Sequence, residues 1–124
     1  MFLDKFNLDS KVALITGGSR GIGLSIAHAL GEAGAKLVLT SRSDSNGATE
    51  ELKKANYDVS FYEGYLIDRS VPQKIVDFTL EKHDRIDILV NNSGVAQHGD
   101  TEKFNDDLLD KIMDLNVDAV FRMC

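Results

Sequence analysis

The sequence predicts an α/β fold, a doubly wound parallel sheet with helices on both faces. Short apolar runs alternate along the chain with longer segments of helical periodicity. The short runs are continuously apolar, as in parallel strands that are buried on both faces. A glycine-rich stretch separates the first apolar run from the first helical segment. We therefore expect about four strands, each followed by a helix, in one domain over residues 1–124.

The first half of the chain is expected to hold two strands and two helices. The first strand is Val12 to Ile15, because VALI is uninterrupted and apolar. A helix over residues 22–33 follows, with apolar residues at helical spacing and Gly34 as its stop signal. LVLT at residues 37–40 predicts the second strand, and residues 46–55 predict a polar helix.

The second half repeats this alternation. Residues 59–62 predict a third, weaker strand, and either Asp68 or Ser70 is expected to cap the helix that follows. Residues 88–90 predict the fourth strand, and a last helix is expected from near Phe104 to the end of the chain. We expect this last helix to pack into the core through Leu108, Leu109, Ile112, Met113, Leu115, Val117, Val120 and Phe121.

Composition narrows the possible functions. The chain is 43% hydrophobic and 27% charged, which is ordinary for a soluble globular protein. Its net charge of −6 disfavours nucleic acid as a partner, since phosphate backbones require a basic face. A single cysteine and the absence of a secretory signal favour a reducing, cytoplasmic location. The chain has no run of 18 apolar residues, so we expect no membrane span.

The turn after the first strand reads T-G-G-S-R-G-I-G, from Thr16 to Gly23. Gly17 can make the tight turn off the strand, and Gly21 lets a ligand approach the backbone closely. Gly23 lets the helix pack against the sheet, while the helix N-terminus offers free N–H groups to a pyrophosphate. The turn therefore predicts a Rossmann-like dinucleotide site.

Two other motifs overlap this turn. Gly17 to Gly21 also matches G-x-S-x-G, the nucleophile elbow of α/β-hydrolases, which would make Ser19 a nucleophile. This alternative is disfavoured because no earlier strand can supply an oxyanion donor. Gly18 to Ser25 nearly matches the phosphate-binding loop of nucleoside triphosphatases, G-x-x-x-x-G-K-[ST]. Leu24, however, stands where that loop requires lysine.

Three motifs in order, T-G-x-x-x-G-x-G, N-N-S-G and L-N-V, resemble those of the classical short-chain dehydrogenase/reductase family. They occupy Thr16–Gly23, Asn91–Gly94 and Leu115–Val117, and the resemblance covers essentially the whole chain. It implies the sheet order 3-2-1-4, and hydride transfer between a nicotinamide dinucleotide and a small carbonyl or alcohol substrate. It also implies a homo-oligomer, and dinucleotide contacts at Gly17, Ser19, Arg20, Gly21, Ile22, Gly23, Asn91, Ser93 and Gly94.

The resemblance further implies that Asn116 is the family's catalytic asparagine, which orders a water in a proton relay. The alternative is an asparagine inside a helix that is satisfied by local hydrogen bonds. Two positions depart from the family pattern. Ser93 replaces the commoner alanine, and Tyr65 stands where the family usually places an aspartate beside the adenine.

The end of the second strand favours NADP(H) over NAD(H). An NAD site needs an acidic residue there to bind the ribose 2′-hydroxyl. The sequence instead reads Thr40-Ser41-Arg42-Ser43, and Arg20 in the glycine turn can approach the same place. An arginine can bind a 2′-phosphate with a bidentate fork, although Asp44 is the nearest acid and weakens the argument slightly.

The family's proton donor, a tyrosine in Tyr-x-x-x-Lys, is missing from these 124 residues. Tyr57, Tyr62 and Tyr65 are followed four residues later by Phe, Leu and Arg. We therefore expect a truncated member of the family, one that carries the cofactor half and is inactive alone. The alternative is a short protein that binds a dinucleotide or dimerises without catalysis. The sequence shows no metal site.

Overall fold

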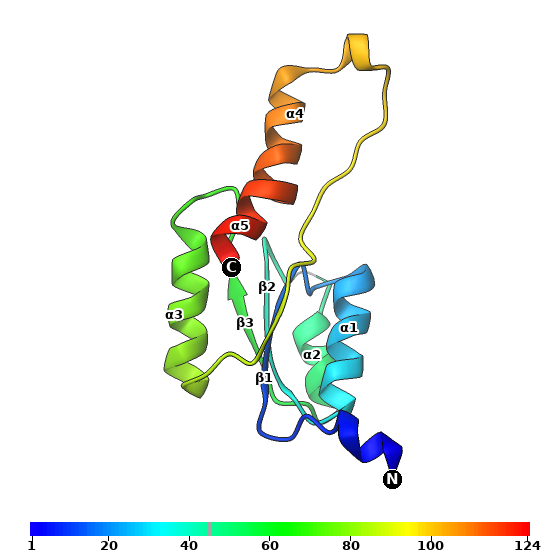
Figure 1. Ribbon diagram of the computed structural model, residues 1–124, viewed down its shortest axis with the longest axis vertical. Helices are drawn as coiled ribbons and strands as arrows, with labels where there is room; N and C mark the ends of the chain where they lie inside the picture. The colour runs from blue at the N-terminus through cyan, green and yellow to red at the C-terminus, as the bar shows by residue number, and fades with distance from the viewer. Residues whose placement is uncertain (45) are drawn as a thin grey trace.

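The computed structural model describes residues 1–44 and 46–124. A sheet of four parallel strands lies at its centre (Figure 1). Their order across the sheet is β3-β2-β1-β4, which confirms the predicted 3-2-1-4 arrangement. Ile15 pairs with Leu39 on one side and with Val90 on the other, so β1 lies inside the sheet. The strands are β1 (Val12–Thr16), β2 (Lys36–Ser41), β3 (Val59–Glu63) and β4 (Ile88–Val90).

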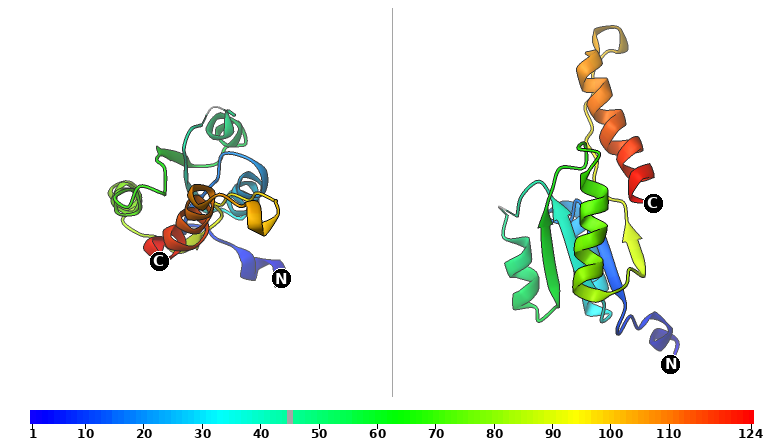
Figure 2. Two further views of the ribbon diagram at one scale, coloured as in Figure 1. Left: turned by 90° about the horizontal axis from the view of Figure 1, so that it is seen from above. Right: turned by 90° about the vertical axis from the view of Figure 1, so that its left-hand side faces the viewer.

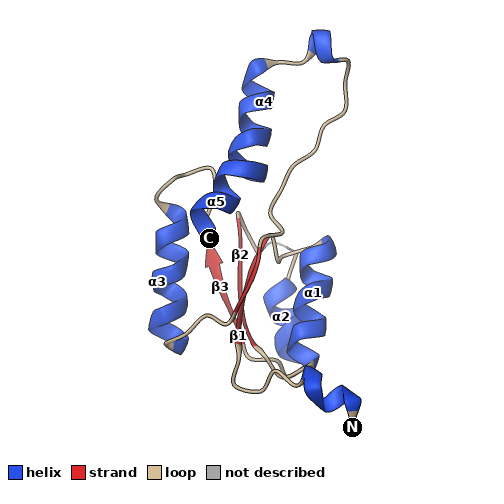
Figure 3. Cartoon of the chain, in the orientation of Figure 1, coloured by secondary structure: helices blue, strands red, loops and turns tan. Residues whose placement is uncertain are grey.

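Helices cover both faces of the sheet, as the continuously apolar strands predict (Figure 3). Alternate residues of β1 enter two separate cores. Ala13 and Ile15 face α1 (Gly21–Glu32) and α2 (Ala48–Lys54), while Val12 and Leu14 face α3 (Val71–His83) and α5 (Ala119–Met123). The fold is therefore doubly wound, and every residue of β1 is buried.

The last helical segment differs from the single core helix that we expected. A 3-10 turn (Thr101–Lys103) comes first, and Asn105 caps α4 (Asp106–Met113) by accepting from the backbone N–H of Asp107 at 2.7 Å. A π-helical stretch, Asp114–Asp118, then joins α4 to α5.

Within the described residues, no helix is long and apolar enough to cross a membrane.

The expectation that the apolar residues of this segment enter the core was wrong for half of them. Helix α4 contains no buried residue and projects away from the sheet (Figure 2). Only Leu115 of the predicted apolar set is buried, together with Ala119 and Met123, which were not predicted. Four members of the set instead form an exposed apolar ridge with a spacing of four residues, Leu109, Met113, Val117 and Phe121.

The predicted start and stop signals act much as expected. Gly34 ends α1 with a φ of +103°, a conformation that side-chain-bearing residues rarely adopt. Ser70 is the N-cap of α3, but its side chain makes no capping bond. The carboxylate of Asp68 instead accepts from the Ser70 backbone N–H at 2.9 Å and from its hydroxyl at 2.7 Å.

Asp87 fastens the start of β4 to β1. Its carboxylate accepts a hydrogen bond from the Val12 backbone N–H at 2.8 Å, and its own N–H donates to the Val12 carbonyl at 2.9 Å. Arg85 donates two hydrogen bonds to the same carboxylate, from Nη2 at 2.6 Å and from Nε at 2.7 Å. The hydrogen bond from Arg85, followed by that from Val12, lowers the pKa of Asp87.

Because of this contact, we expect the stability of the fold to decrease at acid pH. Because the folded-state pKa of Asp87 lies below its unfolded value of about 3.9, its contribution is complete above that value and is lost as the pH falls through the folded pKa. Asp87→Asn should lower the urea midpoint at pH 7, and the difference from wild type should shrink towards pH 3. Urea titrations at both pH values check this, and an unchanged difference would contradict it.

Candidate functional site

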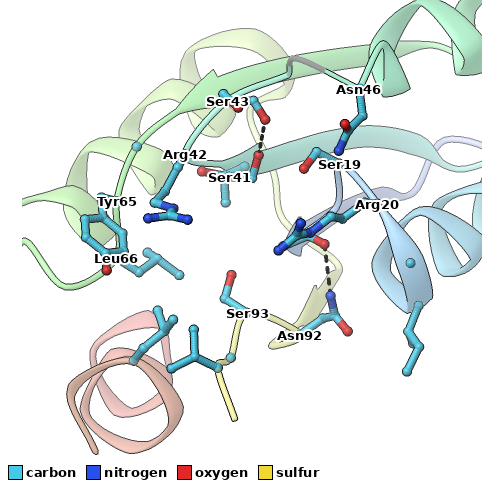
Figure 4. A pocket seen from close by; sticks show the side chains of 18 of the residues that line it. Ser19, Arg20, Ser41, Arg42, Ser43, Asn46, Tyr65, Leu66, Asn92 and Ser93 are labelled. Carbon is cyan, nitrogen blue, oxygen red and sulfur yellow. Dashed lines mark hydrogen bonds between the residues drawn. The ribbon is translucent and has the colours of Figure 1, made fainter. Parts of the chain in front are cut away.

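A cleft of about 540 Å³ opens at the edge of the sheet where the strands end (Figure 4). Parallel pairing brings the four carboxyl ends together. Thr16 pairs with Thr40 and Thr40 with Tyr62, while Ile15 pairs with Val90 at the end of β4. The cleft is lined by the segments that follow all four strands, and by Lys111 and Leu115 from the last helical segment. Ligands of open α/β sheets bind at this position, where the strand order reverses.

The glycine turn forms one wall of the cleft. Gly17 has a φ of +64°, and its N–H donates to the Thr40 carbonyl at 2.8 Å, which turns the chain sharply off β1. Gly21 has a φ of +56°, and a Cβ at this position would meet no atom within 4 Å. Glycine is therefore required at residue 21 by the backbone conformation, and its open side leaves room for a ligand.

Gly23 lies behind the cleft and holds α1 against the turn. A Cβ here would overlap the Gly17 carbonyl oxygen and come within 2.5 Å of Asn92 Nδ2. Both neighbours are fixed, because Asn92 Nδ2 donates to that same Gly17 oxygen at 3.0 Å. The absence of a side chain at Gly23 thus positions the N-terminus of α1 beneath the turn, in agreement with the packing role that the motif predicts.

Thr16 connects the turn to the segment after β4. Its buried hydroxyl oxygen accepts from the backbone N–H groups of Asn92 and Ser93, both at 3.0 Å, and its O–H donates to the Val90 carbonyl at 3.4 Å. One hydroxyl therefore fixes two cleft walls relative to each other. Thr16 belongs to the T-G-x-x-x-G-x-G motif but was not among the predicted contacts.

The two adjacent asparagines after β4 have different roles. Asn92 lines the cleft, whereas Asn91 does not, and the Asn91 amide instead donates to Cys124 Sγ at 3.6 Å. Of the other sequence-predicted contacts, Gly23 lies outside the lining and eight line the cleft, namely Gly17, Ser19, Arg20, Gly21, Ile22, Arg42, Ser93 and Gly94. The structure therefore brings most of the predicted residues together.

The cleft is positively charged in a chain whose net charge is −6. Arg20, Arg42 and Lys111 line it, and none of the described lining residues is Asp or Glu. Figure 4 shows the guanidinium groups of Arg20 and Arg42 approaching the same space from opposite walls. Asp44, the nearest acid in sequence, does not line the cleft, and its carboxylate accepts from the Thr49 N–H at the start of α2, at 3.3 Å.

Arg42 also contacts an aromatic ring. Its guanidinium carbon lies 5.1 Å from the centre of the Tyr65 ring, within the range of a cation–π interaction. Tyr65 and Leu66 follow β3 and line the cleft on that side. Thr40 also lines the cleft, and its buried hydroxyl has no hydrogen-bond partner among the described residues.

Asn116 lies in the π-helical stretch and clamps the segment after β4. Its amide nitrogen donates to the Val95 carbonyl at 2.8 Å, and its amide oxygen accepts from the Val95 N–H at 2.8 Å. A side-chain amide has two donor hydrogens and two acceptor lone pairs, so one of each remains. The side chain can therefore hold Val95 and still bind a water molecule.

Other chemistries find little support in the described part of the chain. It contains no group of three or more His, Cys, Asp or Glu side chains that could hold a metal ion. No described histidine lines the cleft, so Ser19 has no base of that kind beside it there. The cleft instead combines backbone N–H groups, hydroxyls and cations, which are donors suited to phosphate groups.

Residues 11–124 match the family model described as short chain dehydrogenase. An uncharacterised oxidoreductase of Escherichia coli, YgcW, is 34% identical over 122 residues, which cover 98% of this chain and 47% of that protein. A 2-dehydro-3-deoxy-D-gluconate 5-dehydrogenase of Pseudoalteromonas atlantica is 36% identical over 122 residues, with coverages of 96% and 48%. The chain thus spans about half the length of the curated relatives it matches.

Solved structures show the same relationship. The crystal structure of gox2181 superposes with a TM-score of 0.95 at 32% identity, covering 100% of this chain and 49% of that one. A metagenomic short-chain oxidoreductase in complex with NADP has a TM-score of 0.89 at 31% identity, with coverages of 94% and 54%. A Burkholderia phymatum member in complex with NAD has a TM-score of 0.91 at 26% identity, with coverages of 94% and 42%. The chain belongs to the short-chain dehydrogenase/reductase family.

Proposed function

We propose that the chain, as one domain over residues 1–124, is the cofactor-binding part of an oxidoreductase that transfers a hydride between NADP(H) and a small carbonyl or alcohol substrate. The observation that carries the choice of NADP(H) is the charge of the cleft. Arg20, Arg42 and Lys111 line it without any described acidic residue. A 2′-phosphate would be held by such cations, whereas a free ribose 2′-hydroxyl calls for an acid.

The residues present fit a dinucleotide. Gly21 offers an open backbone surface, and Gly17 turns the chain so that the N-terminus of α1 faces the cleft. These groups would hold the pyrophosphate, with Ser19 and Ile22 beside them. Ser93 and Gly94 would border the ribose on the β4 side. When bound, NADPH would supply the hydride, and the protein would supply position and charge.

Asn116 would act in positioning a water molecule. Its clamp on Val95 fixes the amide, and its remaining donor and acceptor valences can order that water for a proton relay. Proton transfer to the developing alkoxide still requires an acid, and none of the tyrosines in these 124 residues carries a lysine four positions later. We therefore propose that this chain binds the cofactor and does not turn over substrate by itself.

Arg42→Met is expected to weaken NADPH binding by about tenfold or more, because charge-assisted hydrogen bonds to the 2′-phosphate are lost. NADH affinity should change little, since NADH lacks that phosphate. Isothermal titration of both nucleotides against wild type and variant measures the selectivity. Arg69→Met is the matched control, because Arg69 is exposed and does not line the cleft. NADH binding as tight as NADPH binding in wild type would refute the assignment.

A second candidate function is a non-catalytic dinucleotide-binding or dimerisation protein. The observation that favours it is the exposed apolar ridge of Leu109, Met113, Val117 and Phe121, where Phe121 is 83% exposed. Apolar residues spaced four apart on a helix can pack against a second helix. The ridge also supports a homo-oligomer under the first proposal. Sedimentation velocity of wild type and Phe121→Ser separates a self-associating chain from a monomer.

A further inference from the structure

Arg42 and Tyr65 both line the cleft and contact each other there. Gly64 and Tyr65 follow β3, and the Gly64 N–H donates to the Ser41 carbonyl at 2.9 Å. That hydrogen bond holds the segment carrying Tyr65 beside the end of β2, at the residue that precedes Arg42. The backbone thus brings the aromatic ring and the guanidinium together, at 5.1 Å.

The two side chains differ in exposure and in conformational freedom. Arg42 is exposed, and it makes no ion pair with any carboxylate in residues 1–44 and 46–124. A free arginine of this kind samples many rotamers, and binding a phosphate must restrict them. Tyr65 is half-buried and carries only two side-chain torsions. The ring is therefore the ordered partner, and the guanidinium is the group that it orders.

The contact with Tyr65 places the Arg42 guanidinium on the side of the cleft where Arg20 lies. In Figure 4 the Arg42 guanidinium lies on the side of the Tyr65 ring that faces Arg20. The two guanidinium groups thereby share one region of the cleft, into which no described acid projects. A phosphate entering that region would meet Arg42 already in place, and pre-ordered donors bind more tightly than mobile ones.

We propose that Tyr65 is a positioning residue for Arg42, which holds the guanidinium ready for the 2′-phosphate of NADP(H) and so increases selectivity for that cofactor. The inference rests on the proposed function, because it needs a 2′-phosphate in this cleft. Tyr65 would act through Arg42, which its ring contacts, and stacking of the ring on adenine is the alternative that the experiment separates. A cation–π contact at an exposed site corresponds to about a two- to fivefold change in affinity.

The experiment compares two probes that differ by one phosphate, adenosine 2′,5′-bisphosphate and adenosine 5′-monophosphate. Isothermal titration with this chain gives the ratio of their affinities. Tyr65→Leu should lower that ratio about two- to fivefold, whereas Tyr65→Phe, which keeps the ring, should preserve it. In the Arg42→Met background, Tyr65→Leu should have no further effect on the ratio, since the group it orders is gone.

Three other results would contradict the proposed role of Tyr65 or the NADP(H) assignment. If Tyr65→Leu weakens both probes equally, with or without Arg42, the ring stacks on adenine and the inference is overturned. If Tyr65→Leu keeps the full ratio while wild type prefers the bisphosphate, the inference fails and the NADP(H) assignment stands. If wild type itself binds both probes equally, the assignment fails first. Thermal unfolding of each variant shows whether lost binding reflects lost structure.

Discussion

Replacing Gly23 by alanine is expected to abolish detectable binding of NADPH to this chain. The added Cβ would overlap the Gly17 carbonyl oxygen and approach Asn92 Nδ2 to 2.5 Å. Neither neighbour can withdraw cheaply, because one is backbone and the other donates a hydrogen bond to it at 3.0 Å. The helix must therefore move away from the turn, which displaces the N–H groups that would hold the pyrophosphate.

The same clash should destabilise the fold by about 1–3 kcal/mol, as overpacking of a close contact does. Urea unfolding and isothermal titration measure the two effects separately. Ser25→Ala is the matched control, since Ser25 is exposed on the same helix and gains no contact on substitution. A Gly23→Ala variant that binds NADPH as wild type does would show that the turn and helix need not touch.

Thr16→Val is the second substitution with a large expected effect. Valine has nearly the same shape, but it cannot accept the hydrogen bonds from the N–H groups of Asn92 and Ser93. Leaving partly buried donors without a partner should cost about 1–3 kcal/mol of unfolding free energy. Because this hydroxyl ties the segment after β4 to the turn after β1, NADPH affinity should also fall.

Thr16→Ser provides the control for this substitution, because serine keeps the hydroxyl that both N–H groups need. We expect it to retain most of the stability and the binding, with a small loss from the missing methyl group. Urea midpoints of the three proteins, followed by NADPH titrations, give the comparison. If valine and serine variants behave alike, the hydroxyl does not hold the two walls together.

The sequence predicted the sheet well for a physical reason. Residues 12–15 and 37–39 are buried on both faces, so their apolar character is continuous and cannot be confused with an amphipathic pattern. The strand order then followed from the family resemblance and the βα alternation. The turn at Gly17 to Gly23 was equally predictable, because positive φ angles and a close approach both require glycine.

The burial of the last helical segment could not be predicted from the sequence. An apolar stripe that is buried in its own fold and one that is exposed on the surface have the same periodicity in a sequence. Leu109, Met113 and Val117 therefore could not be distinguished from core residues. The π-helical stretch adds a residue to one turn, which changes the face that later residues present.

Within the site, the sequence located the cleft but did not assign every residue of it. Which of two adjacent asparagines faces the cleft depends on where β4 ends, and strand ends are fixed by pairing more than by local sequence. Asn92, and not Asn91, lines the cleft for this reason. Lys111 lies far along the chain from the glycine turn, so only the folded arrangement places it in the cleft.

The central claim is that the cleft at the carboxyl edge of the sheet binds NADPH. A two-dimensional NMR titration of the isotope-labelled chain with NADPH tests it most directly, because each backbone amide reports its own surroundings. We predict shifts that saturate together at Gly17–Gly23, at Ser41 to Ser43 and at Asn92 to Gly94, with smaller shifts at Tyr65. Shifts confined to the ridge of Leu109 to Phe121, or no saturable shifts, would contradict the account.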